Sequence, residues 1–166
     1  MRPVLLPALV ALLALPACGT LRPSSEPTEA VPSTRAAATA NAQKWRAANV
    51  RAYTFTYERQ CFCTAELRGP FVVTVANGAV ASVRRLAGGM TPDGTPAPGA
   101  EDRRPENRLR VEDFFALLDG AFAENAAEVR VAYDRRLGFP TSVWIDRDRQ
   151  MADEEVGYRL TDLRRR

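Results

Sequence analysis

Two of the three cysteines stand one residue apart, as Cys61-Phe62-Cys63, and they are the residues in this chain best suited to chemistry. The chain contains no histidine. Nucleophile activation of the Ser-His-Asp or Cys-His type is therefore excluded, as is a His-Glu-x-x-His zinc site. A zinc site built on the two thiols would need two further soft ligands. The remaining interpretations are a structural disulfide, free thiols or a mixed disulfide with a partner, and a thiol–disulfide redox pair.

Geometry restricts the disulfide interpretation. Residues two apart on a straight strand have Cα atoms about 6.6 Å apart, at the far limit of what a disulfide spans. A Cys61–Cys63 bond therefore requires the chain to bend at Phe62 and the strand to end there. A redox pair requires a thiol pKa lowered by cations or a helix N-terminus. Arg59 and Arg68 are near in sequence, whereas the position at a strand end counts against the redox interpretation.

A second candidate is the acidic segment IDRDRQMADEE, with Asp146, Asp148, Asp153, Glu154 and Glu155. It does not fit a calcium-binding EF-hand loop, because Gln150 and Met151 occupy positions of an acid and the turn glycine, and Gly157 replaces the bidentate glutamate. Because arginines alternate with the acids, we expect a solvated turn; an irregular calcium site and paired-carboxylate hydrolysis are the weaker alternatives. No Ser-x-x-Lys or phosphate-binding loop is present. We therefore expect no catalytic residue, no metal and no cofactor.

The N-terminus predicts export. Residues 1–17, MRPVLLPALVALLALPA, combine one charge with an apolar run too short to cross a bilayer, which is typical of a signal peptide. Leu15-Pro16-Ala17-Cys18 resembles the lipobox of bacterial lipoproteins, although Pro16 stands where a small residue is commoner. The resemblance implies lipidation of Cys18 and anchoring to a membrane of the cell envelope, on its periplasmic or extracellular face. In such an oxidising compartment Cys61 and Cys63 are expected to form a disulfide.

Composition divides the rest of the chain. Residues 18–40 are rich in Pro, Ser, Thr and Ala, and they predict a lipid-anchored flexible stalk. Residues 41–166 are long enough for a single domain. The net charge of +3 is spread over interleaved acids and bases, so we expect no nucleic-acid partner.

Hydrophobic periodicity predicts the elements of this domain. A helix is expected over 41–51, followed by a strand in which Tyr53, Phe55 and Tyr57 face inward. Asn77-Gly78 lies between two β-branched runs, so strands 71–76 and 79–86 should form a hairpin. The Gly- and Pro-rich stretch 87–108 predicts a long irregular loop.

The second half repeats the order of the first. An amphipathic helix is expected over 111–125, then strands within 128–134 and 141–146 and a last strand over 156–160. Short connections favour antiparallel pairing. We predict an α+β fold with a single antiparallel sheet of about six strands, in the order α-β-β-β-α-β-β-β, and helices packed on one face.

Several motifs in this order resemble a known family. They are W…Y-x-F-x-Y…C-x-C, V-T-V-x-N-G, V-E-D-x-F-x-L-L, V-x-Y-D…G-F-P-T-S-V-x-I-D and A-D-E-E, spread from Trp45 to Leu163. The family is an uncharacterised group of bacterial secreted and lipoprotein domains, domain of unknown function 6174. The resemblance implies a lipoprotein setting and no particular activity.

These observations lead to two functional expectations. The first is a non-catalytic, membrane-anchored binding or envelope-maintenance domain, which contacts an envelope protein or polymer through its exposed sheet face or the 87–108 loop. The alternative is a thiol–disulfide redox protein that uses Cys61 and Cys63.

Overall fold

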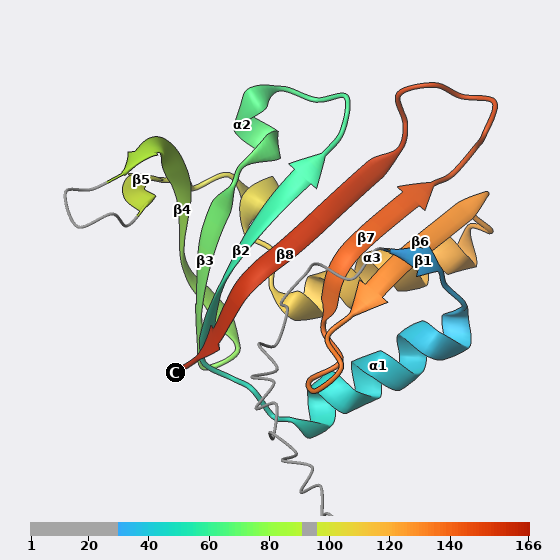
Figure 1. Cartoon of the computed structure of the whole chain (residues 1–166), viewed down its shortest axis with the longest axis horizontal. Coiled ribbons are helices and arrows are strands. Elements are labelled where there is room, and N and C mark those ends of the chain that lie inside the picture. Colours follow the sequence, from blue (N-terminus) through green and yellow to red (C-terminus); the bar gives the residue numbers. More distant parts are fainter. Residues whose placement is uncertain (1–29, 91–95) are drawn as a thin grey trace, which may run out of the picture.

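The structure is a computed structural model that describes residues 30–90 and 96–166. The predicted signal peptide 1–17, the predicted lipidation site Cys18 and the first part of the predicted stalk lie outside the described residues. The described chain forms one antiparallel sheet with helices α1 and α3 against one face (Figure 1).

The elements follow one another along the chain in this order: β1 Val31–Pro32, α1 Arg35–Ala47, β2 Tyr53–Gln60, α2 Ala65–Arg68, β3 Phe71–Ala76, β4 Ala79–Met90, β5 Pro96–Glu101, the 3-10 turn η1 Pro105–Asn107, α3 Val111–Ala123, β6 Glu128–Tyr133, β7 Pro140–Asp146 and β8 Val156–Arg165. The order of strands across the sheet is β1-β6-β7-β8-β2-β3-β4-β5, and every neighbouring pair is antiparallel. The predicted α+β class and single antiparallel sheet are confirmed.

The predicted number of about six strands is wrong, because the sheet has eight. The two additional strands, β1 and β5, lie at its two edges. β1 is two residues long, too short for any periodicity to reveal it. β5 contains Pro96 and Pro98, which indicate a loop by composition but are tolerated on an edge strand. The predicted irregular loop 87–108 is therefore partly ordered: β4 continues to Met90, and β5 and η1 follow, while 91–95 lie outside the described residues.

The first helix begins six residues before its predicted start at residue 41 and ends at Ala47. The hydroxyl of Thr34 accepts a hydrogen bond from the backbone N–H of Ala37 at 3.2 Å and caps the helix. Residues 35–40, predicted as stalk, are thus helical, because an alanine-rich run favours helix once it is capped and packed. Ala38 is buried and contributes to the core.

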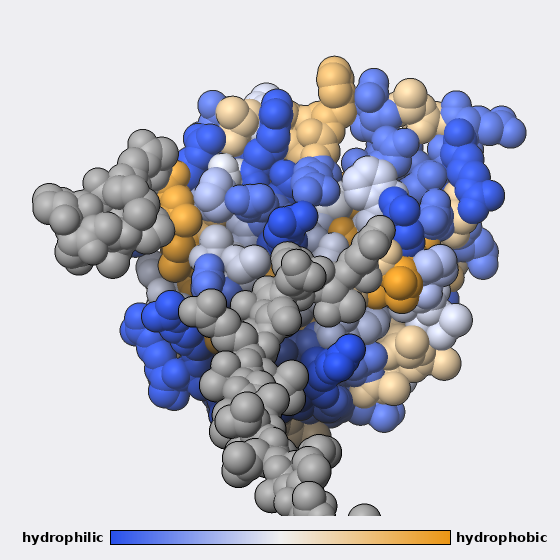
Figure 2. Space-filling view, in the orientation of Figure 1, coloured by the Kyte–Doolittle hydropathy of each residue, from blue (hydrophilic) through white to orange (hydrophobic). Residues whose placement is uncertain are grey.

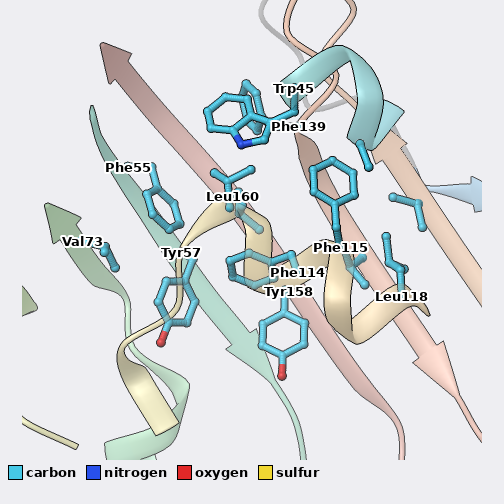
Figure 3. Close-up of a cluster of buried hydrophobic side chains, with 14 of the residues drawn as sticks. Trp45, Phe55, Tyr57, Val73, Phe114, Phe115, Leu118, Phe139, Tyr158 and Leu160 are labelled. Atoms are coloured by element: carbon cyan, nitrogen blue, oxygen red, sulfur yellow. The ribbon is translucent and has the colours of Figure 1, made fainter. Parts of the chain in front are cut away.

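Aromatic side chains form the centre of the core. The predicted inward positions of β2 are confirmed, since Tyr53, Phe55 and Tyr57 are all at most 1% exposed. Phe114 of α3 packs against Phe55 and Tyr57 with its ring roughly perpendicular to theirs (Figure 3). Trp45 of α1 packs in the same way against Tyr53. Both long helices therefore cover the inner face of β2 and its neighbours, and the other face of the sheet is open.

The predicted hairpin is confirmed. Asn77 and Gly78 have φ of 53° and 77°, and Ala76 pairs with Ala79 across the turn. Positive φ at both central residues is the geometry of a type I′ turn, whose twist matches that of the flanking strands.

Replacing Gly78 by alanine should destabilise the domain by about 1 kcal/mol, because alanine resists a positive φ. Nothing lies within 4 Å of the added Cβ, so the cost comes from the backbone alone. Gly120→Ala is the matched control: its site is also open, but it lies inside α3, where alanine should stabilise by about 0.5–1 kcal/mol. Urea unfolding of both variants measures the two effects. Changes of the same sign in the free energy of unfolding would contradict the expectation.

Candidate functional site

The Cys-x-Cys segment and the acidic segment meet at one end of the sheet. β2 and β8 run antiparallel, and Gln60, the last residue of β2, pairs with Gly157 near the start of β8. Gly157 pairs on its other side with Trp144 of β7. The loop after β2 and the loop between β7 and β8 therefore project from the same end of the sheet (Figure 1). We call this region the rim site: Gln60 to Cys63, Trp144, Met151, Asp153, Glu155 and Gly157.

Cys61 and Cys63 lie at disulfide distance from each other. Their Cα atoms are 5.3 Å apart, closer than the about 6.6 Å of a straight strand. The bend that such a bond requires is present: β2 ends at Gln60, and residues 61–63 form a bend. A short helix that the sequence did not predict, α2, begins at Ala65 directly after it.

The bend turns an aromatic side chain into solvent. Phe62 is 81% exposed, although large apolar side chains are usually covered. Met151, in the neighbouring β7–β8 loop, is 58% exposed. Figure 2 shows this view of the domain as mainly hydrophilic, with separate hydrophobic residues among the polar ones, some of them at the end where β2 stops. The rim site thus presents apolar surface within a polar face.

A pocket of about 260 Å³ lies beside Phe62. It is lined by the aromatic rings of Phe62 and Trp144, by two carboxylates and by residues of the β2 end: Gln60, Cys61, Phe62, Trp144, Asp153 and Glu155. Gly157 makes this arrangement fit, because a Cβ there would lie 3.0 Å from both Trp144 Cε3 and Gln60 Oε1. A side chain at position 157 would therefore push against Trp144 and Gln60, two of the residues that line the pocket.

Trp144 already holds one cation. The guanidinium carbon of Arg130, on β6, lies 5.5 Å from the centroid of the Trp144 ring. Arg130 also pairs with Glu128, with 3.6 Å between Nε and Oε1. The indole is therefore held across the outer face of the sheet, with an arginine on its β6 side and the pocket toward β2.

The sequence model of one protein family matches residues 37–165, and its description is a family of unknown function, DUF6174. The chain belongs to this family. The predicted resemblance is confirmed. Comparisons with curated proteins and with solved structures found no match. None of the described helices in this DUF6174 domain is long and apolar enough to cross a membrane.

The acids of the DUF6174 domain's β7–β8 loop divide into two sets. Glu154 Oε1 accepts hydrogen bonds from the backbone N–H groups of Arg147 and Asp148 at 2.7 and 2.6 Å, so this carboxylate organises the loop. Asp153 and Glu155 line the pocket instead. Within residues 30–90 and 96–166, no group of three or more Cys, Asp or Glu side chains is placed to hold a metal ion.

Asp146, the last residue of β7, has the least favourable surroundings of the acids in this segment. It is 9% exposed, and its buried Oδ1 has no hydrogen-bond partner. Burial, followed by a hydrogen bond with Glu154 and the charges of Glu154 and Glu155, raises the pKa of Asp146, against a weaker lowering by Arg149. The ionised carboxylate is therefore disfavoured in the folded domain.

The Asp146→Asn variant should be more stable than the wild type at pH 7. A carboxyl group whose pKa is higher in the folded state binds its proton more tightly when folded. The stabilisation of the folded state by this tighter proton binding is complete below the unfolded pKa of about 3.9. It is lost as pH rises through the folded pKa. The advantage of Asn should therefore shrink below about pH 4.

Urea unfolding of both proteins at pH 7 and at about pH 3.5 tests this expectation. Asp119→Asn, at an exposed position on α3, is the control for losing a carboxylate. An Asp146→Asn variant less stable than the wild type at pH 7 would contradict the proposed cost of the charge.

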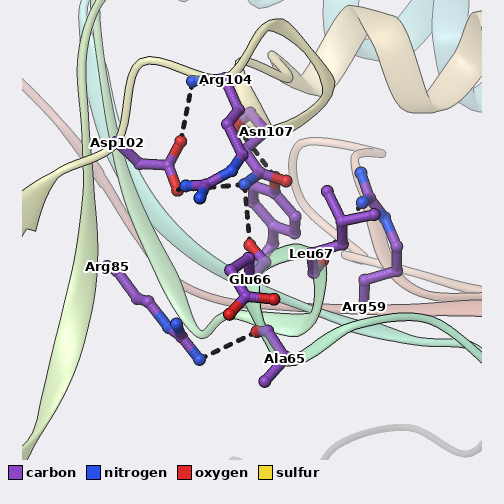
Figure 4. Close-up of polar contacts among 9 residues, drawn as sticks. Arg59, Ala65, Glu66, Leu67, Arg85, Asp102, Arg104 and Asn107 are labelled. Carbon is purple, nitrogen blue, oxygen red and sulfur yellow. Dashed lines mark hydrogen bonds and ion pairs between the residues drawn. The ribbon is translucent and has the colours of Figure 1, made fainter.

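The rim site rests on a polar network that sequence reasoning missed. Arg68 Nε donates to the carbonyl of Cys63 at 2.9 Å. Asn107 Nδ2 donates to the carbonyl of Glu66 and to Asp102 Oδ2 at 3.0 and 3.1 Å (Figure 4). Asn107 is fully buried. The bonds fasten α2, and with it the bend at Phe62, to η1. The only sequence signal was two polar residues in a stretch expected to be a loop.

Proposed function

We propose that this DUF6174 protein is a membrane-anchored bacterial lipoprotein whose domain binds an envelope partner without catalysis, through the rim site. The observation that carries the proposal is Phe62: it is 81% exposed, stands on a bend flanked by two cysteines at disulfide distance, and borders a pocket. Exposed aromatic residues on a constrained backbone are typical anchors of protein interfaces, because little side-chain entropy is lost on binding.

The lipid anchor is proposed from the first eighteen residues. An apolar run with one N-terminal charge ends in a lipobox-like segment at Cys18, which fits cleavage and acylation at that cysteine. Radiolabelled palmitate should enter the wild-type protein and should not enter the Cys18→Ser variant. Label in neither protein, together with recovery from the cytosol, would contradict the anchor.

Photo-cross-linking in intact cells tests the binding surface. A photoreactive phenylalanine analogue replaces Phe62, and in a matched control it replaces Ala116, an exposed residue of α3. We expect adducts of defined mass from position 62 and none from position 116. Adducts from both positions, or from neither, would argue against the rim site as the binding surface.

A thiol–disulfide redox protein is the second candidate. The favouring observation is that Cys61 and Cys63 are only half-buried, at the end of a strand, so another thiol can reach them. Differential alkylation followed by intact mass of the exported protein separates the two functions. A reduced, rapidly alkylated pair supports redox exchange, whereas an oxidised pair inert to mild reductant supports a structural role.

A further inference from the structure

The rim pocket combines two aromatic rings and two carboxylates, and its lining includes no basic side chain. We propose that it binds the cationic side chain of a lysine or arginine that lies in a basic, partly apolar segment of a partner protein. The inference rests on the proposed binding function of the rim site and specifies what that site recognises.

No ion pair among the described residues neutralises the charge of the pocket. Among the described residues, Asp153 and Glu155 take part in no ion pair, whereas Asp102, Asp113 and Glu128 each pair with an arginine. Two unpaired carboxylates at one pocket favour a cationic ligand by charge complementarity.

The aromatic rings add to this preference. A cation over the face of a tryptophan or phenylalanine is attracted by the ring quadrupole, most strongly by tryptophan. Trp144 shows the preference within this domain, because Arg130 lies 5.5 Å from its ring centroid on the β6 side. On the opposite side, Phe62, Asp153 and Glu155 line the pocket together with Trp144.

The size of the pocket and its surroundings favour a protein segment over a small free ligand. A volume of about 260 Å³ lies just below the range of about 300–1,000 Å³ found for sites that enclose whole small molecules. It suits a single side chain. Phe62, which lines it, is 81% exposed and would remain largely uncovered by a lone amine. A segment with apolar residues next to its cation would cover this ring.

Binding can be followed at the two tryptophans of the chain. The probe is a short synthetic peptide with two lysines flanked by leucines, titrated into the ¹⁵N-labelled full-length protein in a maltoside detergent, which carries no ammonium group. We expect the indole N–H resonance of Trp144 to shift. The resonance of Trp45, which is 2% exposed, is the internal control and should stay in place. A peptide with glutamine at the lysine positions should bind at least about fivefold more weakly.

Substitutions distinguish recognition of the peptide's charge from non-specific hydrophobic binding. Asp153→Asn with Glu155→Gln should weaken lysine-peptide binding by about five- to tenfold, since two ion pairs are lost. The charge-matched control is Asp119→Asn with Asp162→Asn, two exposed positions on α3 and toward the far end of β8, and should change binding less than twofold. Gly157→Ala should also weaken binding, because its Cβ would push against Trp144 and Gln60.

Two results would overturn the inference: equal binding of the lysine and glutamine peptides, or equal affinities for the two charge-removing variants. No shift at Trp144 with any peptide would overturn it as well. Failure here is distinguishable from failure of the proposed function. If cross-links form at position 62 in cells while basic peptides do not bind, only the ligand class is wrong; without cross-links at position 62, the binding surface itself is wrong.

Discussion

Phe114→Ala is expected to lower the free energy of unfolding by about 3–5 kcal/mol, the largest effect of any substitution considered. Phe114 is fully buried, and its ring lies 5.7 Å from that of Tyr57, 6.3 Å from Phe55 and 5.2 Å from Tyr158. Alanine would leave a cavity between α3 and the sheet and remove three aromatic contacts at once.

The matched control is Phe62→Ala, the same chemical deletion at a side chain that is 81% exposed. It should change stability by less than about 0.5 kcal/mol. Urea unfolding monitored by circular dichroism measures both variants. Comparable losses would mean either that Phe114 is not central to the core or that Phe62 is packed against the domain.

Glu112→Ala is expected to cost about 2–4 kcal/mol. Glu112 lies in the first turn of α3 and accepts hydrogen bonds from Trp45 Nε1 at 2.8 Å and from the Tyr53 hydroxyl at 3.1 Å. It thus joins α1, β2 and α3. Both donors belong to fully or nearly fully buried residues, so removing the carboxylate leaves them without an acceptor in an apolar environment.

The hydroxyl of Tyr53 also accepts a hydrogen bond from the backbone N–H of Val111 at 3.1 Å. Burial is the main reason that the pKa of Tyr53 is raised, so the phenol stays protonated and keeps donating to Glu112. Glu106→Ala, which removes an exposed carboxylate, is the control and should cost less than about 0.5 kcal/mol. A double-mutant cycle with Tyr53→Phe should give a coupling energy above about 0.5 kcal/mol; additive losses would show that the pair does not interact.

Much of the fold was predictable because neighbouring residues encode it. Strand β3 and the Asn77-Gly78 turn depend on β-branched runs and on residues that accept positive φ. The inward alternation of β2 and the start of α3 at Val111 also follow from local patterns. The bend at Phe62 could be anticipated in the same way, since a disulfide between cysteines two apart on a straight strand would lie at the limit of its span.

The errors arose where packing overrides composition. The residues of α1 from 35 to 40 are alanine-rich and polar, and they fold as helix because Thr34 caps them and Ala38 is buried in the core. β5 is rich in proline, and it is a strand because β4 offers it a free edge. Neither the cap's effectiveness nor the free edge can be read from the segment itself.

The sequence by itself determined the order of the two long helices and of six of the eight strands, the hairpin at Asn77-Gly78 and the bend that a Cys61–Cys63 bond requires. Only the tertiary structure decided that this segment meets Trp144 and the acids Asp153 and Glu155, about ninety residues later in the chain. The physical reason is the antiparallel pairing of β2 with β8, which places Gln60 opposite Gly157. Pairing between distant strands depends on how the whole core packs. A local sequence pattern therefore cannot predict the pocket that this pairing forms.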